Sequence, residues 1–270
     1  MSAVDAAVAV ADAHGVRCEK PVVLREAWHV LVHLSPSPVV ARVTSGAPGV
    51  DPADVERELS VARHAARAGA PVVQPSDLLP PGPHHRDGHT LVFWTYLVQV
   101  GKLDPAAAGR GLRAIHDSLA DYDGELPRAG RAEEVRSMLA PFAPSDDVEL
   151  LCELASRELP VGQALHGDAH LFNCIQTPAG SVWHDLETAC RGPREYDLAA
   201  LLLSDRSGDP QPDARTAAAA YGPYDEEILE QALPVYASWV AASFMVAIAR
   251  RPDAAPALER QLKFLRRFRR

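Results

Sequence analysis

Over the first hundred residues, short apolar runs alternate with polar turns, a pattern typical of strands. Ser35-Pro36-Ser37 separates two of these runs and predicts a hairpin. One amphipathic stretch interrupts the strands: Asp51 and Pro52 open a predicted helix, and Gly69 ends it. The predicted strands of this region are 22–24, 30–34, 38–43 and 90–100.

Beyond Gly101 the apolar positions recur every three or four residues, which predicts helices. Strands return only between residues 161 and 187, where Pro178-Ala179-Gly180 turns one strand into the next. We therefore predict an α+β protein, with a small β-rich lobe at residues 1–96 and a larger helical lobe at residues 97–270. The predicted helices are 105–121, 131–140, 146–158, 195–204, 213–221 and 225–250, the last kinked or broken near Pro234.

The composition excludes a membrane protein and a disulfide-stapled secreted domain. Hydrophobic residues make up 47% of the 270, but no apolar run approaches the roughly 20 residues that span a bilayer. The first residues carry no basic lead, so they do not resemble a signal peptide. The four cysteines lack CxxC spacing and are expected to be reduced and structural. A cytoplasmic protein without a membrane partner is expected.

The formal charge of −9 is unevenly distributed along the chain. Residues 259–270 carry six basic residues and one acidic residue, yet Leu258, Leu262 and Leu265 recur at helical spacing. A terminal helix docked by its apolar side is therefore expected. The rest of the helical lobe is strongly acidic, which disfavours nucleic acid as a partner. No obligate protein partner is evident.

The densest chemistry lies in LHGDAHLFNC, residues 165–174. On a strand, His166, Asp168 and His170 would share one face and could hold zinc. His184 and Asp185 could supply a second group of ligands. A zinc hydrolase is thus one interpretation, although it leaves Asn173 and the predicted hairpin that follows it without a role.

A phosphoryl-transfer loop explains more of these residues. In kinase catalytic loops a His-x-Asp sequence is followed by four residues and then an asparagine. Asp168 and Asn173 have this spacing, and Asp185 comes twelve residues later, after a predicted strand-turn-strand. Carboxylate and amide oxygens suit a hard cation such as Mg²⁺ better than zinc. The spacing therefore favours a kinase-type site.

The segment LHGDAHLFNCIQTPAGSVWHDLETACRGPREYDLAALL resembles the aminoglycoside phosphotransferase family, kinase-like enzymes that include the choline kinases. Its signature is His-Gly-Asp-x-x-x-x-Asn, an aspartate at a strand end, and Tyr-Asp-Leu-Ala opening a helix. The stretches RELSVARHAARAGAPV, FWTYL and GLRAIHDSL extend the resemblance over nearly the whole chain. It implies a bilobal protein-kinase-like fold, ATP or GTP as phosphate donor, Mg²⁺, and transfer to a hydroxyl of a small molecule.

The motif assigns a role to each of its polar residues. Asp168 is expected to orient the acceptor hydroxyl and take its proton, and Asn173 and Asp185 to hold magnesium. Glu187 would share a face with Asp185 if the strand continues, and could touch substrate or a metal-bound water. The residues expected to support the loop are His166, His170 and Asp197, with a substrate-side role equally open for His170.

The nucleotide lobe departs from the usual kinase pattern in two ways. The strand lysine that holds phosphates is replaced by Arg42, whose guanidinium can still clamp phosphate beside a helix glutamate. The loop REAWHV contains no glycine, and Trp28 and His29 could crowd the phosphates. The expected nucleotide-binding residues are Arg42, Glu58, Trp94, Tyr96 and Leu97.

The acceptor is the least determined part of this hypothesis. The acidic lobe favours a cationic acceptor, such as an aminoglycoside or a basic peptide antibiotic, with Asp205, Asp209, Asp213, Asp225, Glu226 and Glu227 as candidate contacts. A metabolite kinase with a choline- or amino-sugar-like acceptor is an alternative. For choline, Tyr236, Trp239 and Phe244 could form an aromatic cage. A protein that binds nucleotide without catalysis is another alternative, favoured by Arg42 and the glycine-free loop.

Overall fold

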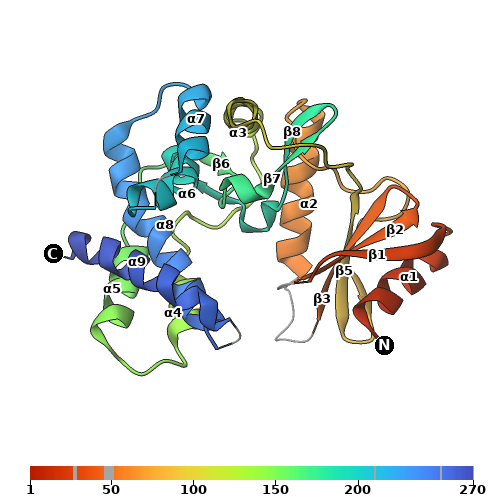
Figure 1. The fold of residues 1–270 in the computed structure, drawn as a ribbon, viewed down its shortest axis with the longest axis horizontal. Helices are drawn as coiled ribbons and strands as arrows, with labels where there is room; N and C mark the ends of the chain where they lie inside the picture. The colour runs from red at the N-terminus through yellow and green to blue at the C-terminus, as the bar shows by residue number, and fades with distance from the viewer. Residues whose placement is uncertain (27–28, 46–51, 210, 250, 270) are drawn as a thin grey trace. The chain divides into compact units, whose positions relative to one another are not determined.

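The computed structural model describes all residues except 27–28, 46–51, 210, 250 and 270 (Figure 1). Asp51, predicted to open a helix, and Trp28, predicted to lie near the phosphates, are outside the described residues. The chain divides into two compact units: unit 1 comprises Met1–Leu103 and Ile175–Glu187, and unit 2 comprises Asp104–Cys174 and Thr188–Arg270. Among the helices described, none is both long and apolar enough to cross a membrane.

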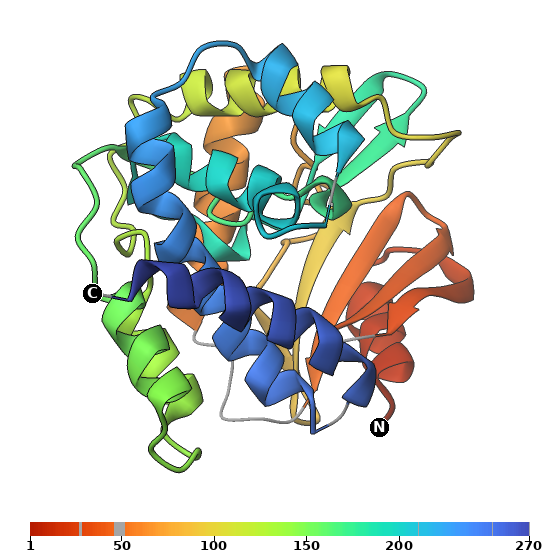
Figure 2. The same cartoon turned by 60° about the vertical axis from the view of Figure 1, so that its left-hand side comes forward.

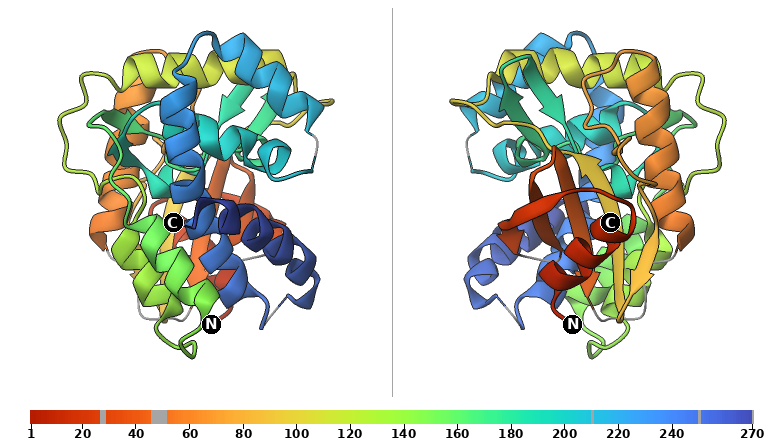
Figure 3. Two further views of the ribbon diagram at one scale, coloured as in Figure 1. Left: turned by 90° about the vertical axis from the view of Figure 1, so that its left-hand side faces the viewer. Right: turned by 90° about the vertical axis from the view of Figure 1, so that its right-hand side faces the viewer.

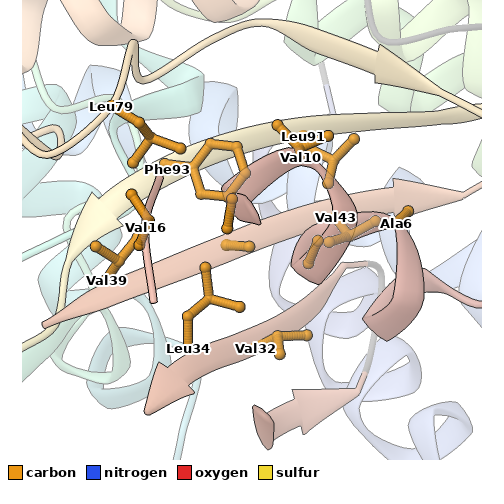
Figure 4. Close-up of a cluster of buried hydrophobic side chains, with 13 residues drawn as sticks. Ala6, Val10, Val16, Val32, Leu34, Val39, Val43, Leu79, Leu91 and Phe93 are labelled. Carbon is orange, nitrogen blue, oxygen red and sulfur yellow. The ribbon is translucent and has the colours of Figure 1, made fainter. Parts of the chain in front are cut away.

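Unit 1 is built on an antiparallel sheet with the strand order β1-β2-β3-β5-β4 (Figure 1). One face of the sheet packs against α1, where Ala6 and Val10 meet Leu34, Val43 and Phe93 of the strands (Figure 4). The predicted hairpin at residues 35–37 is confirmed, and β4 was missed because it is only three residues long. The elements of unit 1 are α1 (Ala3–Ala13), β1 (Cys18–Glu26), β2 (Val30–Pro36), β3 (Val39–Ser45), α2 (Pro52–Arg67), β4 (His84–Arg86), β5 (His89–Thr95), β7 (Cys174–Thr177) and β8 (Gly180–Trp183).

The opposite face of the sheet carries α2. Side chains alternate along a strand, so Arg42, between the α1-facing Ala41 and Val43, points to the α2 side. On the same side, Val92 of β5 packs with Val55 and Leu59 of α2. Leu31 and Val92 are the register partners of residue 42 on the two neighbouring strands. The alternation thus brings one buried cation to the helix that carries Glu58.

From Ile175 onward the hairpin β7–β8 belongs to unit 1, although it comes late in the sequence. The backbone N–H of Trp183 donates to Pro71 O at 2.8 Å, and Val73 N–H donates back to Trp183 O at 2.8 Å. Val100 N–H also donates to Gln176 O at 2.9 Å. These bonds attach both strands of the hairpin to the first hundred residues, so Asp185, two residues beyond Trp183, is carried by unit 1.

Unit 2 is helical, with α3 packed beside α7 (Figure 3). Helix α8 packs against α4, α5, α6 and α9 and continues past Pro234. Of the predicted kink or break at this proline, the break is wrong and the kink stays a prediction. The short strand β9, which pairs with β6, was not predicted. The elements of unit 2 are α3 (Pro105–Ser118), α4 (Ala132–Leu139), α5 (Asp146–Ala155), β6 (Gln163–Leu165), β9 (Cys190–Gly192), α6 (Glu195–Arg206), α7 (Pro212–Tyr221), α8 (Glu226–Ala247) and α9 (Ala255–Leu265).

The basic end of the chain docks as expected. Helix α9 lies across α8 (Figure 2) and buries Phe264 and Leu265. Two of the basic side chains that follow α9 pair with α5: Arg266 Nη2 donates to Asp147 at 2.9 Å, and Arg269 Nη1 donates to Asp146 at 3.1 Å. This segment is therefore part of unit 2 and not a separate basic arm.

The four cysteines differ in their expected reactivity. All are free thiols; Cys174 and Cys190 are buried, whereas Cys18 and Cys152 are partly exposed. Burial raises the pKa of Cys174 to about 12 and raises that of Cys190 as well, which suppresses the reactive thiolate. We expect iodoacetamide at pH 8 to label Cys152 first and to reach Cys174 and Cys190 only after unfolding in urea, as followed by peptide mass spectrometry. Early labelling of Cys190 in folded protein would contradict this burial.

Candidate active site

The loop that follows β6 is shaped by one glycine. Gly167 has φ +89°, and a Cβ at this position would lie 1.9 Å from the carbonyl oxygen of Thr188. The left-handed backbone and the close approach both require glycine. The loop then enters a single 3₁₀ turn, Leu171–Asn173, which brings the side chain of Asn173 back toward Asp168.

A buried carboxylate holds this loop from beneath. Asp197, in the first turn of α6, accepts hydrogen bonds from the backbone N–H groups of His166 at 2.9 Å and Gly167 at 2.8 Å. His116 Nε2 lies 2.8 Å from the same carboxylate, and His116 Nδ1 lies 2.8 Å from the Tyr221 hydroxyl. Removing any one of these hydrogen-bonding side chains would leave its buried polar neighbours without partners. The sequence pointed to Asp197, but it gave no role to His116 or Tyr221.

Asp168 is surrounded by three side-chain donors. The Tyr236 hydroxyl donates to Oδ1 in a short hydrogen bond. His170 Nε2 lies 3.3 Å from Oδ2, and Asn173 Nδ2 donates to Oδ2 at 3.2 Å. Burial alone would raise the pKa of Asp168, but the hydrogen bonds and charge around it lower the pKa to about 2. The side chain is therefore a fixed, ionised carboxylate.

The zinc interpretation gains no support from this geometry. His166 is fully buried, and its Nδ1 accepts a bond from the backbone N–H of Asp168 at 3.4 Å, so it supports the turn. Among the described residues there is no group of three or more histidine, cysteine, aspartate or glutamate side chains placed to hold a metal.

The residues expected to bind magnesium fit a hard cation by their donor atoms. Asn173 uses its amide nitrogen on the Asp168 side chain and backbone carbonyl, which leaves its amide oxygen as the coordinating atom. Asp185 is 32% exposed and lies 3.6 Å from Arg42 through Oδ1. Its φ of +70° is rare for a residue with a Cβ and clusters at functional sites. Asn173 belongs to unit 2 and Asp185 to unit 1.

The expectation that the strand continues to Glu187 is wrong. Strand β8 ends at Trp183, and a 3₁₀ turn covers Leu186–Thr188. Asp185 and Glu187 nevertheless both approach Arg42. Glu187 Oε2 lies 3.1 Å from Arg42 Nη1, and Asp185 Oδ1 lies 3.6 Å from the same nitrogen. The left-handed backbone at Asp185, and not the alternation of a continued strand, accompanies the approach of Asp185 and Glu187 to the same side chain.

Arg42 is the centre of a carboxylate cluster in unit 1. Its Nη1 donates to Glu58 Oε1 at 3.0 Å, and its Nη2 forms a second, shorter bond to Oε2. Burial would lower the pKa of Arg42, but Glu58, Glu187 and Asp185 together raise it, so the guanidinium stays charged. Burial raises the pKa of Glu58 to about 7 against the attraction of Arg42. The strand–helix ion pair expected from the sequence is thus formed, with arginine in place of lysine.

His29, in the described part of the glycine-free loop, has two hydrogen-bond partners. His29 Nε2 lies 3.1 Å from Glu187 Oε2, and its Nδ1 lies 2.8 Å from the Thr44 hydroxyl. His29 thus contacts the carboxylate that also contacts Arg42, which connects the loop to the cluster around this cation.

The residues expected at the nucleotide base lie at the end of β5 and just beyond it. Trp94 is the last but one residue of the strand and packs on the cluster formed with α2. Tyr96 stacks on His33, with ring centroids 3.7 Å apart and an interplanar angle of 7°. Leu97 follows as a partly buried residue.

Several side chains proposed for acceptor binding have partners within unit 2. Asp225 caps α8, and Arg206 pairs with both Glu226 and Glu230. Arg215 lies 3.2 Å from Asp205. These carboxylates therefore act first as caps and ion-pair partners.

Two aromatic residues of α8 that were considered for a choline cage also have partners within unit 2. Tyr236 contacts Asp168, and the Trp239 indole N–H donates to Glu134 at 3.0 Å. The Arg131 guanidinium lies 5.6 Å from the Trp239 ring centroid. A cation of the protein itself thus occupies one face of the ring on which a choline cage would depend.

A family model described as the phosphotransferase enzyme family matches residues 27–231. A search of curated proteins found no matching sequence.

Solved structures share the fold at low sequence identity. The amicoumacin kinase hAmiN, in complex with AMP-PNP, Ca²⁺ and amicoumacin, has a TM-score of 0.74 at 14% identity, covering 97% of this chain and 93% of that one. The choline kinase LicA from Streptococcus pneumoniae has a TM-score of 0.69 at 16% identity, covering 98% and 99%. A thermostable mutant of the aminoglycoside phosphotransferase APH(4)-Ia has a TM-score of 0.67 at 16% identity, covering 95% and 97%. The predicted protein-kinase-like fold is confirmed.

Proposed function

Because this chain belongs to the phosphotransferase enzyme family, we propose that it transfers the γ-phosphoryl group of ATP or GTP to a hydroxyl of a small molecule. The single observation that carries the proposal is the state of Asp168, an ionised carboxylate held by three donors beside Asn173. A carboxylate of this kind can orient a hydroxyl nucleophile and take its proton as the new bond forms.

The residues of unit 1 support a role in holding the nucleotide. The Arg42 guanidinium is kept charged and is held in place by Glu58. It would take the role of the kinase strand lysine that binds phosphate. Trp94, Tyr96 and Leu97 offer apolar and aromatic surface at the end of β5 for a nucleotide base.

Asn173 and Asp185 are the residues that would hold magnesium. When bound, the metal would supply positive charge against the charge of the phosphates. His166 and Asp197 act on Asp168 through the backbone of the loop, because they fix the turn from which its side chain projects.

A cationic acceptor is the form of the proposal that we favour. The support is the net negative charge of the helical region of the sequence, since several of the individual carboxylates already have local partners. The hAmiN and APH(4)-Ia structures are those of an amicoumacin kinase and an aminoglycoside phosphotransferase. Choline is a weaker candidate, because Arg131 already lies over the Trp239 ring.

The proposal is tested by nucleoside diphosphate release with Mg-ATP and Mg-GTP. The acceptors to be compared are aminoglycosides, amicoumacin-like and basic peptide antibiotics, amino sugars and choline. We expect turnover with one class, together with a product heavier by one phosphoryl group in mass spectrometry. Calorimetry with Mg-AMP-PNP gives an independent reading, and a protein that binds no nucleotide would overturn the proposal.

A further inference from the structure

The two oxygens of the Asp168 carboxylate lie in different surroundings. Oδ1 accepts from the Tyr236 hydroxyl, whose side chain lies on α8 and is only 2% exposed. Oδ2 lies near His170 Nε2, on a side chain that is 35% exposed. Oδ1 therefore contacts a buried side chain of α8, whereas Oδ2 contacts the partly exposed His170 as well as the buried Asn173.

Tyr236 is held firmly where it meets the carboxylate. Its ring makes an edge contact with Tyr196 at 5.6 Å and a tilted contact with Trp239 at 6.1 Å. Trp239 is itself anchored to Glu134 by its indole N–H. Burial and the charge of Asp168 raise the pKa of Tyr236 well above its ordinary value, so the phenol keeps its proton and acts as a donor.

We propose that Tyr236 is a positioning residue that fixes Oδ1 on the buried side and so makes Oδ2 the oxygen that receives the acceptor's proton. This inference rests on the proposed phosphotransferase function. Rotating the carboxylate plane away from this bond would leave the buried phenol without its acceptor, which is costly. A half-turn only exchanges the two equivalent oxygens, so the oxygen that does not contact Tyr236 is the one left for the acceptor. The acceptor hydroxyl then approaches from the side of His170 and takes the place of its ring nitrogen on Oδ2.

The transfer step is balanced under this assignment. The acceptor oxygen forms a bond to the γ-phosphorus while the bond from that phosphorus to the nucleoside diphosphate oxygen breaks. The acceptor's proton passes to Asp168 Oδ2, and Tyr236 keeps its own proton throughout. Tyr236 therefore acts on the reaction only through the direction in which the carboxylate points.

The kinetic test is Tyr236→Phe, which removes one hydroxyl and keeps the ring. We expect kcat to fall by a factor on the order of 10 to 100, as misplacement of a catalytic group does, with KM for acceptor and nucleotide nearly unchanged. The matched control is Tyr122→Phe, which removes a hydroxyl from another buried tyrosine of unit 2 and should keep the wild-type kcat. In an Asp168→Asn background, Tyr236→Phe should cause no further loss, because its effect passes through the carboxylate. Wild-type kcat in Tyr236→Phe would overturn the inference and leave the phosphotransferase proposal standing.

A spectroscopic test does not depend on turnover, and its first reading needs only the wild-type protein. In wild-type protein labelled with ¹³C at tyrosine Cζ and aspartate Cγ, we expect a slowly exchanging Tyr236 hydroxyl proton. We also expect an Asp168 carboxyl signal that shifts in Tyr236→Phe and stays in place in Tyr122→Phe. A rapidly exchanging hydroxyl, or a carboxyl signal insensitive to residue 236, would overturn the inference. If wild-type protein transfers no phosphoryl group, the proposed function fails, while these spectra still decide whether Tyr236 holds Asp168.

Discussion

Replacing Asp168 with asparagine is expected to lower kcat by a factor on the order of 10²–10⁴, the usual contribution of a positioned acid–base group. The change removes the ionised oxygen that takes the acceptor's proton, whereas the Arg42–Glu58 pair of unit 1 is untouched. Nucleotide affinity should therefore stay close to wild type. The measurement is steady-state kinetics with the acceptor found in the panel, together with calorimetry for Mg-AMP-PNP.

The control for Asp168→Asn is the same chemical change at an exposed site. Asp117 is 53% exposed and pairs with Arg113 and Arg194 at the surface of unit 2. Such pairs contribute about 1 kcal/mol or less, so Asp117→Asn should keep wild-type kcat and nearly wild-type stability. An Asp168→Asn enzyme that retains more than a tenth of wild-type kcat would show that another group orients the acceptor, and the proposed mechanism would fail.

The part of the site that the sequence predicts is the part fixed by short-range spacing. Asp168 and Asn173 lie in one loop, and their contact follows from the 3₁₀ turn between them. The pairing of Arg42 with Glu58 was also predictable, because strand alternation and helical periodicity each select one face. In both cases local geometry alone limits where the side chains can lie.

Contacts between distant segments were not predictable in this way. Tyr236 is 68 positions from Asp168, and His116 is 81 positions from Asp197. The sequence shows Tyr236 as an aromatic residue on a late helix, which suits core packing as well as acceptor binding. Only the packing of α8 against its neighbours decides that its hydroxyl reaches the carboxylate.

The end of β8 shows a different kind of limit. Apolar alternation predicted a strand through Glu187, but the chain turns at Asp185 with a positive φ. Aspartate tolerates this left-handed conformation better than most residues, yet nothing in the alternation indicates it. The convergence of Asp185 and Glu187 on Arg42 therefore depends on a backbone feature that the side-chain pattern does not encode.

Replacing Arg42 with methionine is expected to destabilise unit 1 by about 3 kcal/mol or more at pH 8, as the loss of one partner of a buried ion pair does. The methionine fills much of the volume, but Glu58 keeps only 1% side-chain exposure and loses its bidentate partner. Asp185 and Glu187 are 32% and 40% exposed, so water can solvate them after the change. The cost should therefore come mainly from Glu58.

The destabilisation should depend on pH with a definite sign. Burial raises the folded-state pKa of Glu58 from its ordinary 4.5 to about 7 while Arg42 opposes the rise, so without Arg42 the folded-state pKa lies higher still. A raised carboxyl pKa contributes stability below the unfolded pKa, and this contribution is lost as pH rises through the folded pKa. Both proteins should lose stability in parallel up to about pH 7. Above it the wild type levels off, and the deficit of Arg42→Met grows by up to about 1.4 kcal/mol per pH unit.

Urea unfolding of wild type and Arg42→Met at pH 6, 7, 8 and 9 measures this deficit. The double variant Arg42→Met/Glu58→Gln supplies the control, because glutamine has the shape of Glu58 but cannot ionise. Its deficit should stay constant over the same range. If the single variant shows a constant deficit as well, Glu58 does not change its protonation there, and Arg42 is not what keeps this carboxylate ionised above neutral pH. A growing deficit confined to the single variant identifies Arg42 as the residue that maintains a charged strand–helix pair in place of the usual lysine.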